Sequence, residues 1–254
     1  MWCHNGTSMG TSRPNQSLQR GLRCLQMLAA AGRPIGSREM ARELGLEHTR
    51  VHRVLGTLEM LGLAALTEDG KYRPGPALHV LAAQSLRGSR LLAAGLARLR
   101  GLHSRGLTVA LGVLWQGQVC YLIHARPGQT LDEGIGSHEL WPAENSSLGA
   151  VLLAAEGGRM ASPSAERLAP ETPAPLAERR SCLREVRKCG NARLRYPDGT
   201  LSLAVPVGDP VIAAIGLSSP GIEEEEDARL VGELAIAAGE IAAELASTPD
   251  PSAT

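Results

Sequence analysis

The residues of this sequence best suited to chemistry are four polar side chains in the segment Glu47–Leu61. They can donate or accept hydrogen bonds and share one side of a predicted helix: Thr49, Arg50, His52 and Arg53. An arginine can donate two parallel hydrogen bonds to a guanine edge, and threonine and histidine can reach base edges or phosphates. Since the major groove of B-DNA admits one helix, this pattern predicts binding to double-stranded DNA.

The same segment has the apolar periodicity that would leave its polar side in solvent. Five apolar residues follow helical spacing and are predicted to face inward: Val51, Val54, Leu55, Leu58 and Leu61. Gly62 is expected to end this helix. Two helices precede it, one from Ser17 to Ala31 and a shorter one that Ser37 is expected to cap, followed by a tight turn at Gly45-Leu46.

A short hairpin is predicted directly after the third helix. Extended runs at 63–67 and 71–73 flank Glu68-Asp69-Gly70, and glycine readily adopts the positive φ that such turns need. Helix, helix, tight turn, helix and hairpin in this order predict a winged helix-turn-helix over residues 15–76. Lys71 and Arg73 would then lie in the wing, where they suit phosphates or the flanking minor groove.

The charge distribution agrees with a nucleic-acid partner for the front of the chain. Residues 1–79 hold 10 Lys and Arg against 6 Asp and Glu, whereas the 254-residue chain balances 26 against 26, so the front carries +4 and the remainder −4. Arg20 and Arg23 are further candidates for contacts with the DNA backbone. Because one such module makes few contacts, specific binding predicts two copies on an inverted repeat, in a homodimer or tetramer.

The remainder of the chain is predicted to be a mixed α/β domain over residues 91–247, joined to the front by a linker helix at 77–90. Helices are predicted at 91–103, 145–155, 183–188 and 223–245, and strands at 108–114, 119–124, 200–207 and 211–218. The strands form two hairpins, which predicts an antiparallel sheet and an α+β fold class. The segment 157–181 is rich in Pro, Ala and Glu and is expected to be loose.

At this point the sequence resembles the IclR-type bacterial transcriptional regulators, from about Ser17 to Leu245. The segments that carry the resemblance are Gly45–Leu55, the wing Asp69–Gly75, Trp141–Gly149, Ala204–Val207 and Ala213–Ser218. The chain departs from the family pattern at Glu47 and His48, which replace a proline and a basic residue, and at Ala150, which replaces a lysine. The segment between residues 155 and 200 is also shortened.

The resemblance implies an effector site for a small metabolite in the C-terminal domain. The positions that match the family's effector-binding loop and strands are Ser146, Ser147, Leu148, Ser202, Gly216 and Ser218. Small hydroxyls, backbone N–H groups and a helix start suit a carboxylic acid. The alternative is that Ser146 and Ser147 cap a helix and that Ser202 is an ordinary strand residue.

The resemblance further implies a cytoplasmic regulator, expected to act as a repressor, whose operator affinity changes when the effector binds. No cofactor is expected. The sequence holds no apolar run of membrane-spanning length and no secretory signal, and its five cysteines are scattered, which speaks against a metal site.

Two other functions stay open. One is a winged-helix protein whose C-terminal domain only dimerises. The other, a small-molecule enzyme, lacks support, because the sequence has no nucleophile elbow, phosphate-binding loop or dinucleotide fingerprint. His138-Glu139 resembles the start of a zinc-protease motif, but Pro142 stands where the second histidine would be.

Overall fold

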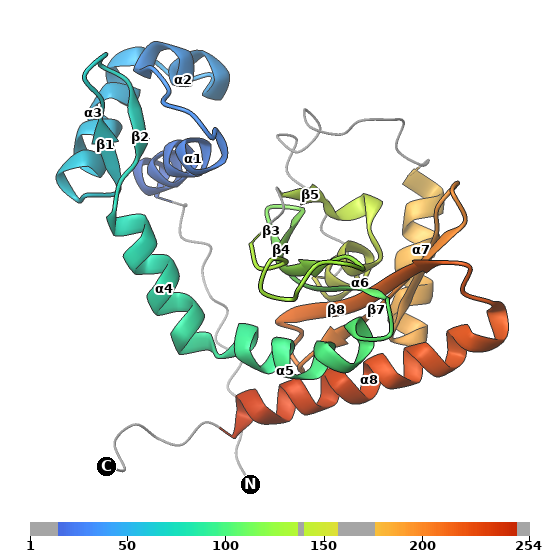
Figure 1. Ribbon diagram of the computed structural model, residues 1–254. Coiled ribbons are helices and arrows are strands. Elements are labelled where there is room, and N and C mark those ends of the chain that lie inside the picture. Colours follow the sequence, from blue (N-terminus) through green and yellow to red (C-terminus); the bar gives the residue numbers. More distant parts are fainter. Residues whose placement is uncertain (1–14, 137–139, 157–175, 248–254) are drawn as a thin grey trace, which may run out of the picture. The chain divides into compact units, whose positions relative to one another are not determined.

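The computed structural model describes residues 15–136, 140–156 and 176–247 (Figure 1). The chain divides into two compact units, Met1–Arg87 and Gly88–Thr254. Each unit has its own apolar core and is described here by itself.

Unit 1 is a winged helix-turn-helix, as the sequence predicted. Its elements are α1 (Gln16–Ala30), α2 (Ser37–Leu44), α3 (His48–Met60), β1 (Ala64–Leu66), β2 (Tyr72–Pro74) and α4 (Ala77–Ser89). The helices α1, α2 and α3 pack on one another around buried side chains that include Leu28, Met40 and Leu55. The antiparallel pair β1–β2 forms the wing, and Ile35 adds a bridge to Tyr72.

Three local predictions for unit 1 were wrong in detail. Ser37 does not cap α2: the N-cap is Gly36, with no side-chain hydrogen bond, and the Ser37 hydroxyl contacts His48 instead. Leu61 was predicted to face inward but is 58% exposed, because α3 ends at Met60 and the chain turns away at Leu61. Val54 is half-buried. The turn between α2 and α3 does follow the prediction, since Gly45 has φ 63° and its N–H bonds to the last carbonyls of α2.

Unit 2 is built on one six-stranded antiparallel sheet with strand order β5-β4-β3-β8-β7-β6 (Figure 1). Its strands are β3 (Thr108–Trp115), β4 (Gln118–Ala125), β5 (Trp141–Pro142), β6 (Ala192–Arg195), β7 (Thr200–Val207) and β8 (Ala213–Pro220). Its helical elements are α5 (Leu91–His103), the 3-10 turn η1 (Ala143–Asn145), α6 (Ser147–Ala155), α7 (Leu176–Cys189) and α8 (Glu224–Ala246). The mixed α/β fold with an antiparallel sheet is thus confirmed.

The two faces of this sheet differ in side-chain size. Strands β7 and β8 place Leu203, Ile215 and other large residues on the face covered by α5 and α8. Because side chains alternate along a strand, the residues between them point to the other face, and there they are small, such as Ala204 and Gly216. Helix α6 packs on this face, and α7 packs on α6. The small residues let α6 lie close to the strands.

The sequence missed some elements of unit 2 and misplaced others. Strands β5 and β6 were not predicted, since two and four residues are too short to show an alternating pattern. Helix α6 begins at Ser147, after a separate 3-10 turn, rather than at Asn145. Helix α7 begins at Leu176, so residues 176–181 are helical and not loose. Residues 157–175 lie outside the described residues.

We expect Gly149→Ala to destabilise unit 2, because an added Cβ would lie 1.9 Å from the backbone oxygen of Ala143. Rearranging backbone to relieve such a clash costs about 1–3 kcal/mol or more. The matched control is Gly101→Ala in α5, where a Cβ meets no atom within 4 Å and the substitution should be neutral or stabilising. Thermal unfolding followed by circular dichroism measures both. Equal melting temperatures for the two variants would contradict the expectation.

Candidate nucleic-acid interface and effector site

The structure places the four predicted DNA-reading residues on the solvent side of α3. Thr49, Arg50, His52 and Arg53 are all exposed. The opposite side of the helix holds Val51, Leu55 and Leu58, which are at most 8% exposed and fix the helix on the core of unit 1. The helix therefore presents a row of hydrogen-bonding groups that its own packing does not use.

The start of α3 is arranged around the residues that depart from the family pattern. Glu47 is the N-cap of α3, and its carboxylate lies 3.7 Å from the guanidinium of Arg50. Both side chains are largely exposed, so this ion pair is weak and Arg50 can exchange it for a phosphate or base. His48 Nε2 lies 2.9 Å from the hydroxyl of Ser37, and its ring stacks on His52 at 6.2 Å. His48 thus connects α2 to α3.

The wing is held by a small hydrogen-bond network around Thr67. The Thr67 hydroxyl lies 2.6 Å from an Asp69 carboxylate oxygen and 2.8 Å from the Lys71 carbonyl, and it accepts a bond from the Lys71 N–H. Lys71 Nζ contacts Asp69 at 2.7 Å. The bonds from Lys71 and Thr67 lower the pKa of the Asp69 carboxyl. The wing is therefore ordered, with Lys71 and Arg73 exposed on it.

The two arginines of α1 were predicted as additional backbone contacts. Arg20 and Arg23 are half-buried, and Arg20 donates a 2.9 Å hydrogen bond to Gln16 within α1. Their contact with DNA stays a prediction.

The residues predicted for effector binding come together where α6 begins. Ser146 is the N-cap of α6, and its hydroxyl accepts a 2.9 Å bond from the Gly149 N–H. Ser147 does not cap the helix: its hydroxyl lies 2.7 Å from that of Ser202 on β7, and both residues are buried. Ser146 therefore acts as the capping alternative stated, whereas Ser147 and Ser202 form a buried polar pair between α6 and the sheet.

The remaining predicted residues lie in the same region. Ser218 on β8 is the register partner of Ser202 on β7. Gly216, two residues before it, packs against Leu148: a Cβ at Gly216 would be 2.6 Å from a Leu148 methyl group. All six residues thus meet at the junction of α6, β7 and β8.

Two tyrosines that the sequence analysis did not single out belong to this region. The Tyr196 hydroxyl donates a 3.2 Å bond to the carbonyl of Asn145, directly before the cap of α6. Burial raises the pKa of Tyr196 to about 12, with smaller contributions from Tyr121 and Asp198. Burial also raises the pKa of Tyr121, although a hydrogen bond with Ser146 opposes the shift. A signal was present, since the chain has only three tyrosines.

This arrangement can bind a small anion with a polar ring or chain. The first turn of a helix offers backbone N–H groups and a positive dipole end, which favour a carboxylate. The hydroxyls of Ser147, Ser202 and Tyr196 supply further donors and acceptors, and the small residues of β7 and β8 leave the strands close to α6. The chemistry is that of a binding site rather than of a nucleophile and base.

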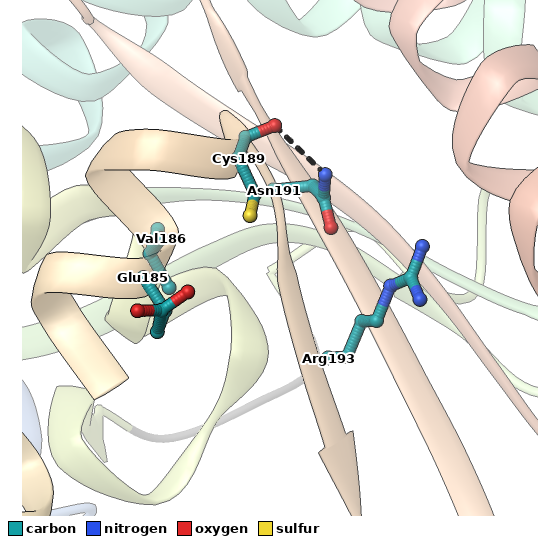
Figure 2. Close-up of a pocket in the computed structure, with 5 residues that line it drawn as sticks. All are labelled: Glu185, Val186, Cys189, Asn191 and Arg193. Atoms are coloured by element: carbon teal, nitrogen blue, oxygen red, sulfur yellow. Dashed lines mark hydrogen bonds between the residues drawn. The ribbon is translucent and has the colours of Figure 1, made fainter. Parts of the chain in front are cut away.

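A separate hollow of about 520 Å³ lies between α7 and β6. It is lined by Glu185, Val186, Cys189, Asn191 and Arg193 (Figure 2). Asn191 donates a 2.9 Å bond to the Cys189 carbonyl across it, and Arg193 is paired with Asp227 at 3.2 Å. It contains none of the residues predicted for effector binding.

Neither a metal centre nor a membrane span is present in the part of the chain that the structure describes. No group of three His, Cys, Asp or Glu side chains could hold a metal ion there. No described helix is both long and apolar enough to cross a bilayer. His138-Glu139 lies outside the described residues.

Comparison with known proteins agrees with both units. Residues 17–67 match the model of the IclR helix-turn-helix domain. None of the curated proteins is significantly similar to the chain. An IclR transcriptional regulator from Alicyclobacillus acidocaldarius is 25% identical with a TM-score of 0.66, over 91% of this chain and 98% of that one.

Two further solved structures share the fold. An IclR homologue from Microbacterium hydrocarbonoxydans, complexed with 4-hydroxybenzoate, is 24% identical with a TM-score of 0.63 and covers 91% of this chain and 100% of its own. An IclR family regulator from Brucella abortus is 20% identical with a TM-score of 0.68, and the coverage is 93% and 94%.

The winged helix-turn-helix with a free polar face on α3 defines a DNA-binding protein, and the sheet unit is the partner domain that such regulators carry. Together with the matches over more than nine-tenths of the chain, these features identify an IclR-type helix-turn-helix transcriptional regulator.

We expect Tyr196 to be the last tyrosine of the described residues to ionise in alkaline solution, because burial raises its pKa to about 12. Since the pKa is above that of an unfolded chain, the stability it reflects is complete below about pH 10 and is lost as the pH rises toward 12. Tyrosinate absorbance after a rapid pH jump measures this. Tyr196→Phe should remove the last phase, and an unchanged titration curve would contradict the assignment.

Proposed function

We propose that this protein is a repressor that binds an operator through α3 and the wing, and that a small carboxylic acid bound in unit 2 changes its operator affinity. DNA binding is assigned to residues 15–76, the connection to 77–90, and effector binding and oligomerisation to 91–247. Because its partner is the chromosome, we place its action in the cytoplasm.

The observation that carries the proposal is the free polar side of α3. Thr49, Arg50 and Arg53 are exposed on a helix whose other side is buried, and none is committed to a strong bond within the chain. We assign base contacts to these residues and to His52, and phosphate or minor-groove contacts to Lys71 and Arg73. Gly56 adds open space on the same helix, so its backbone can approach the DNA closely.

Binding to an inverted repeat requires two copies, and α4 supports such an assembly. This helix has no buried residue, and Val80 and Leu81 are 54% and 53% exposed. Exposed aliphatic side chains next to a DNA-binding unit are typical of surfaces that a second subunit covers. We therefore propose a homodimer, or a tetramer made of two such dimers.

The effector class follows from the chemistry at the start of α6. A carboxylate suits the helix N-terminus, and the hydroxyls of Ser147, Ser202 and Tyr196 suit a second polar group. The complex of the similar Microbacterium hydrocarbonoxydans protein with 4-hydroxybenzoate, an acid with a distant hydroxyl, supports this class. The small residues on β7 and β8 favour a compact ligand.

Regulation requires that the ligand bind one arrangement of the two DNA-binding units better than another. The change in operator affinity then equals the difference between the ligand's affinities for the two arrangements. Release of the operator on ligand binding would convert this difference into transcription.

We expect Arg53→Ala to weaken operator binding by about 1–3 kcal/mol, because it removes an arginine from the exposed face of α3. The control Arg100→Ala removes the same charge from the exposed side of α5 and should leave operator affinity unchanged. Both variants are measured by electrophoretic retardation on the operator that genome-wide binding identifies. Failure of the unaltered protein to retard any promoter fragment at low ionic strength would reject the proposed function.

We expect Ser147→Ala to weaken binding of 4-hydroxybenzoate or other small carboxylic acids measured by calorimetry, because Ser202 loses its hydroxyl partner. Removing one partner of a buried hydrogen bond costs about 1–3 kcal/mol. The control Ser219→Ala alters the next residue but one along from Leu217 on β8, whose hydroxyl bonds only to the Pro220 carbonyl.

Retardation assays with and without the acid test the regulatory part separately. A ligand that binds and leaves operator affinity unchanged would reject effector control and favour a C-terminal domain that only dimerises.

A further inference from the structure

We infer that the outer face of α8 is a docking surface for α8 of a second copy of this chain, with the two helices antiparallel. This face consists of the exposed residues Ala228, Gly232, Ala235, Ile236, Gly239 and Ala243. It holds no charged side chain, and Ile236 near its middle is 66% exposed. The inference deepens the proposed homodimer or tetramer by naming a contact between the C-terminal units.

The glycines of this face have no explanation within the chain. Glycine in the interior of a helix is destabilising relative to alanine. A Cβ at Gly232 or Gly239 would meet no atom within 4 Å, whereas at Gly95 in the neighbouring α5 it would lie 2.7 Å from a Leu111 methyl group. Packing inside unit 2 thus requires glycine in α5 but not here. A helix that approaches from outside requires it, because the distance between packed helices depends on the side chains at their contact.

The positions on this face select a second copy as the occupant. Reversing the order of the six residues maps the set onto itself: Ala228 exchanges with Ala243, Gly232 with Gly239, and Ala235 with Ile236. A two-fold symmetric interface needs such a patch, since the same surface must fit itself. In this register two Ile236 side chains meet beside the two-fold axis and each covers the small residues of the other helix.

The charges at the rim agree with the antiparallel register. By helical periodicity Arg229, Ile236 and Glu240 lie along the same side of α8. In the antiparallel pair, Arg229 lies two residues, about 3 Å along the axis, from Glu240 of the second copy. Within the chain these side chains contact Glu226 and Arg98, and both remain more than half exposed. Opposite charges therefore face each other across an apolar centre.

Helix α5 enlarges the surface. It runs beside α8, to which it is joined by ion pairs of Arg98 with Glu240 and of Arg105 with Glu233. Its exposed residues Ala93 and Ala97 are also small. A single helix pair covers less than the roughly 800 Å² per subunit of a typical stable interface, so the second helix brings the area toward that value.

The first experiment measures the mass of the full chain by sedimentation over a range of concentrations without DNA. Gly239→Arg should weaken self-association at least about tenfold, since a charged side chain replaces an open position at the contact. Ala155→Arg adds the same charge at the exposed end of α6 and should associate like the unaltered protein. Unchanged association of a folded Gly239→Arg protein, checked by circular dichroism, would overturn the inference.

The second experiment tests the register by oxidative cross-linking and does not depend on the arginine variant. Ile236→Cys should form a disulfide between two copies, because the two-fold axis brings these positions within bonding distance. Ala246→Cys, at the exposed end of the same helix, should not, because the antiparallel arrangement separates the two copies of that position. Equal cross-linking of both variants, or cross-linking of Ala246→Cys alone, would overturn the antiparallel contact.

Both readouts are independent of the proposed function. A protein that associates through α8 but never retards DNA would overturn the proposed function and leave this contact standing. One that represses through a different dimer contact would show operator binding with unchanged association of the Gly239→Arg variant.

Discussion

Helix α3 can interact with DNA only because one of its sides is buried. Val51, Leu55 and Leu58 anchor it on α1 and α2, which removes apolar surface from water and fixes the helix axis. The polar side is then held in one orientation without using its own hydrogen bonds. The wing extends this rigid presentation, since Thr67 holds the turn that carries Lys71. A recognition helix without this support would pay the entropy of ordering on binding DNA.

A similar division of labour organises unit 2. One face of its sheet is filled with large aliphatic residues beneath α5 and α8 and supplies the main core. The other face is built from alanine, glycine and serine, so α6 lies close to β7 and β8 and its first turn contacts them through Ser147 and Ser202. Stability and ligand chemistry are therefore assigned to opposite faces of the same strands, and a change at the polar face need not disturb the main core.

Much of this architecture could be predicted from the chain alone. The spacing of Val51, Leu55 and Leu58 and the Asp69-Gly70 turn are local signals, and both elements form as expected. Predictions became less accurate where the pattern was short or the outcome depended on distant partners. Strand β6 has four residues and is recognisable only through its pairing with β7. Leu61 keeps helical spacing, yet it is exposed because the helix ends before it.

The site shows the same limit. Sequence pattern and family resemblance selected Ser146, Ser147 and Ser202, but not Tyr196, whose hydroxyl reaches the carbonyl of Asn145, 51 positions away. The sequence by itself determined the helical and strand periods, the turns and the presence of a free polar side on α3, because these depend on neighbouring residues. Only the tertiary structure decided which serine caps α6 and which pairs with β7, and which tyrosines join them, because those contacts arise when distant segments pack together and bury each other's polar atoms.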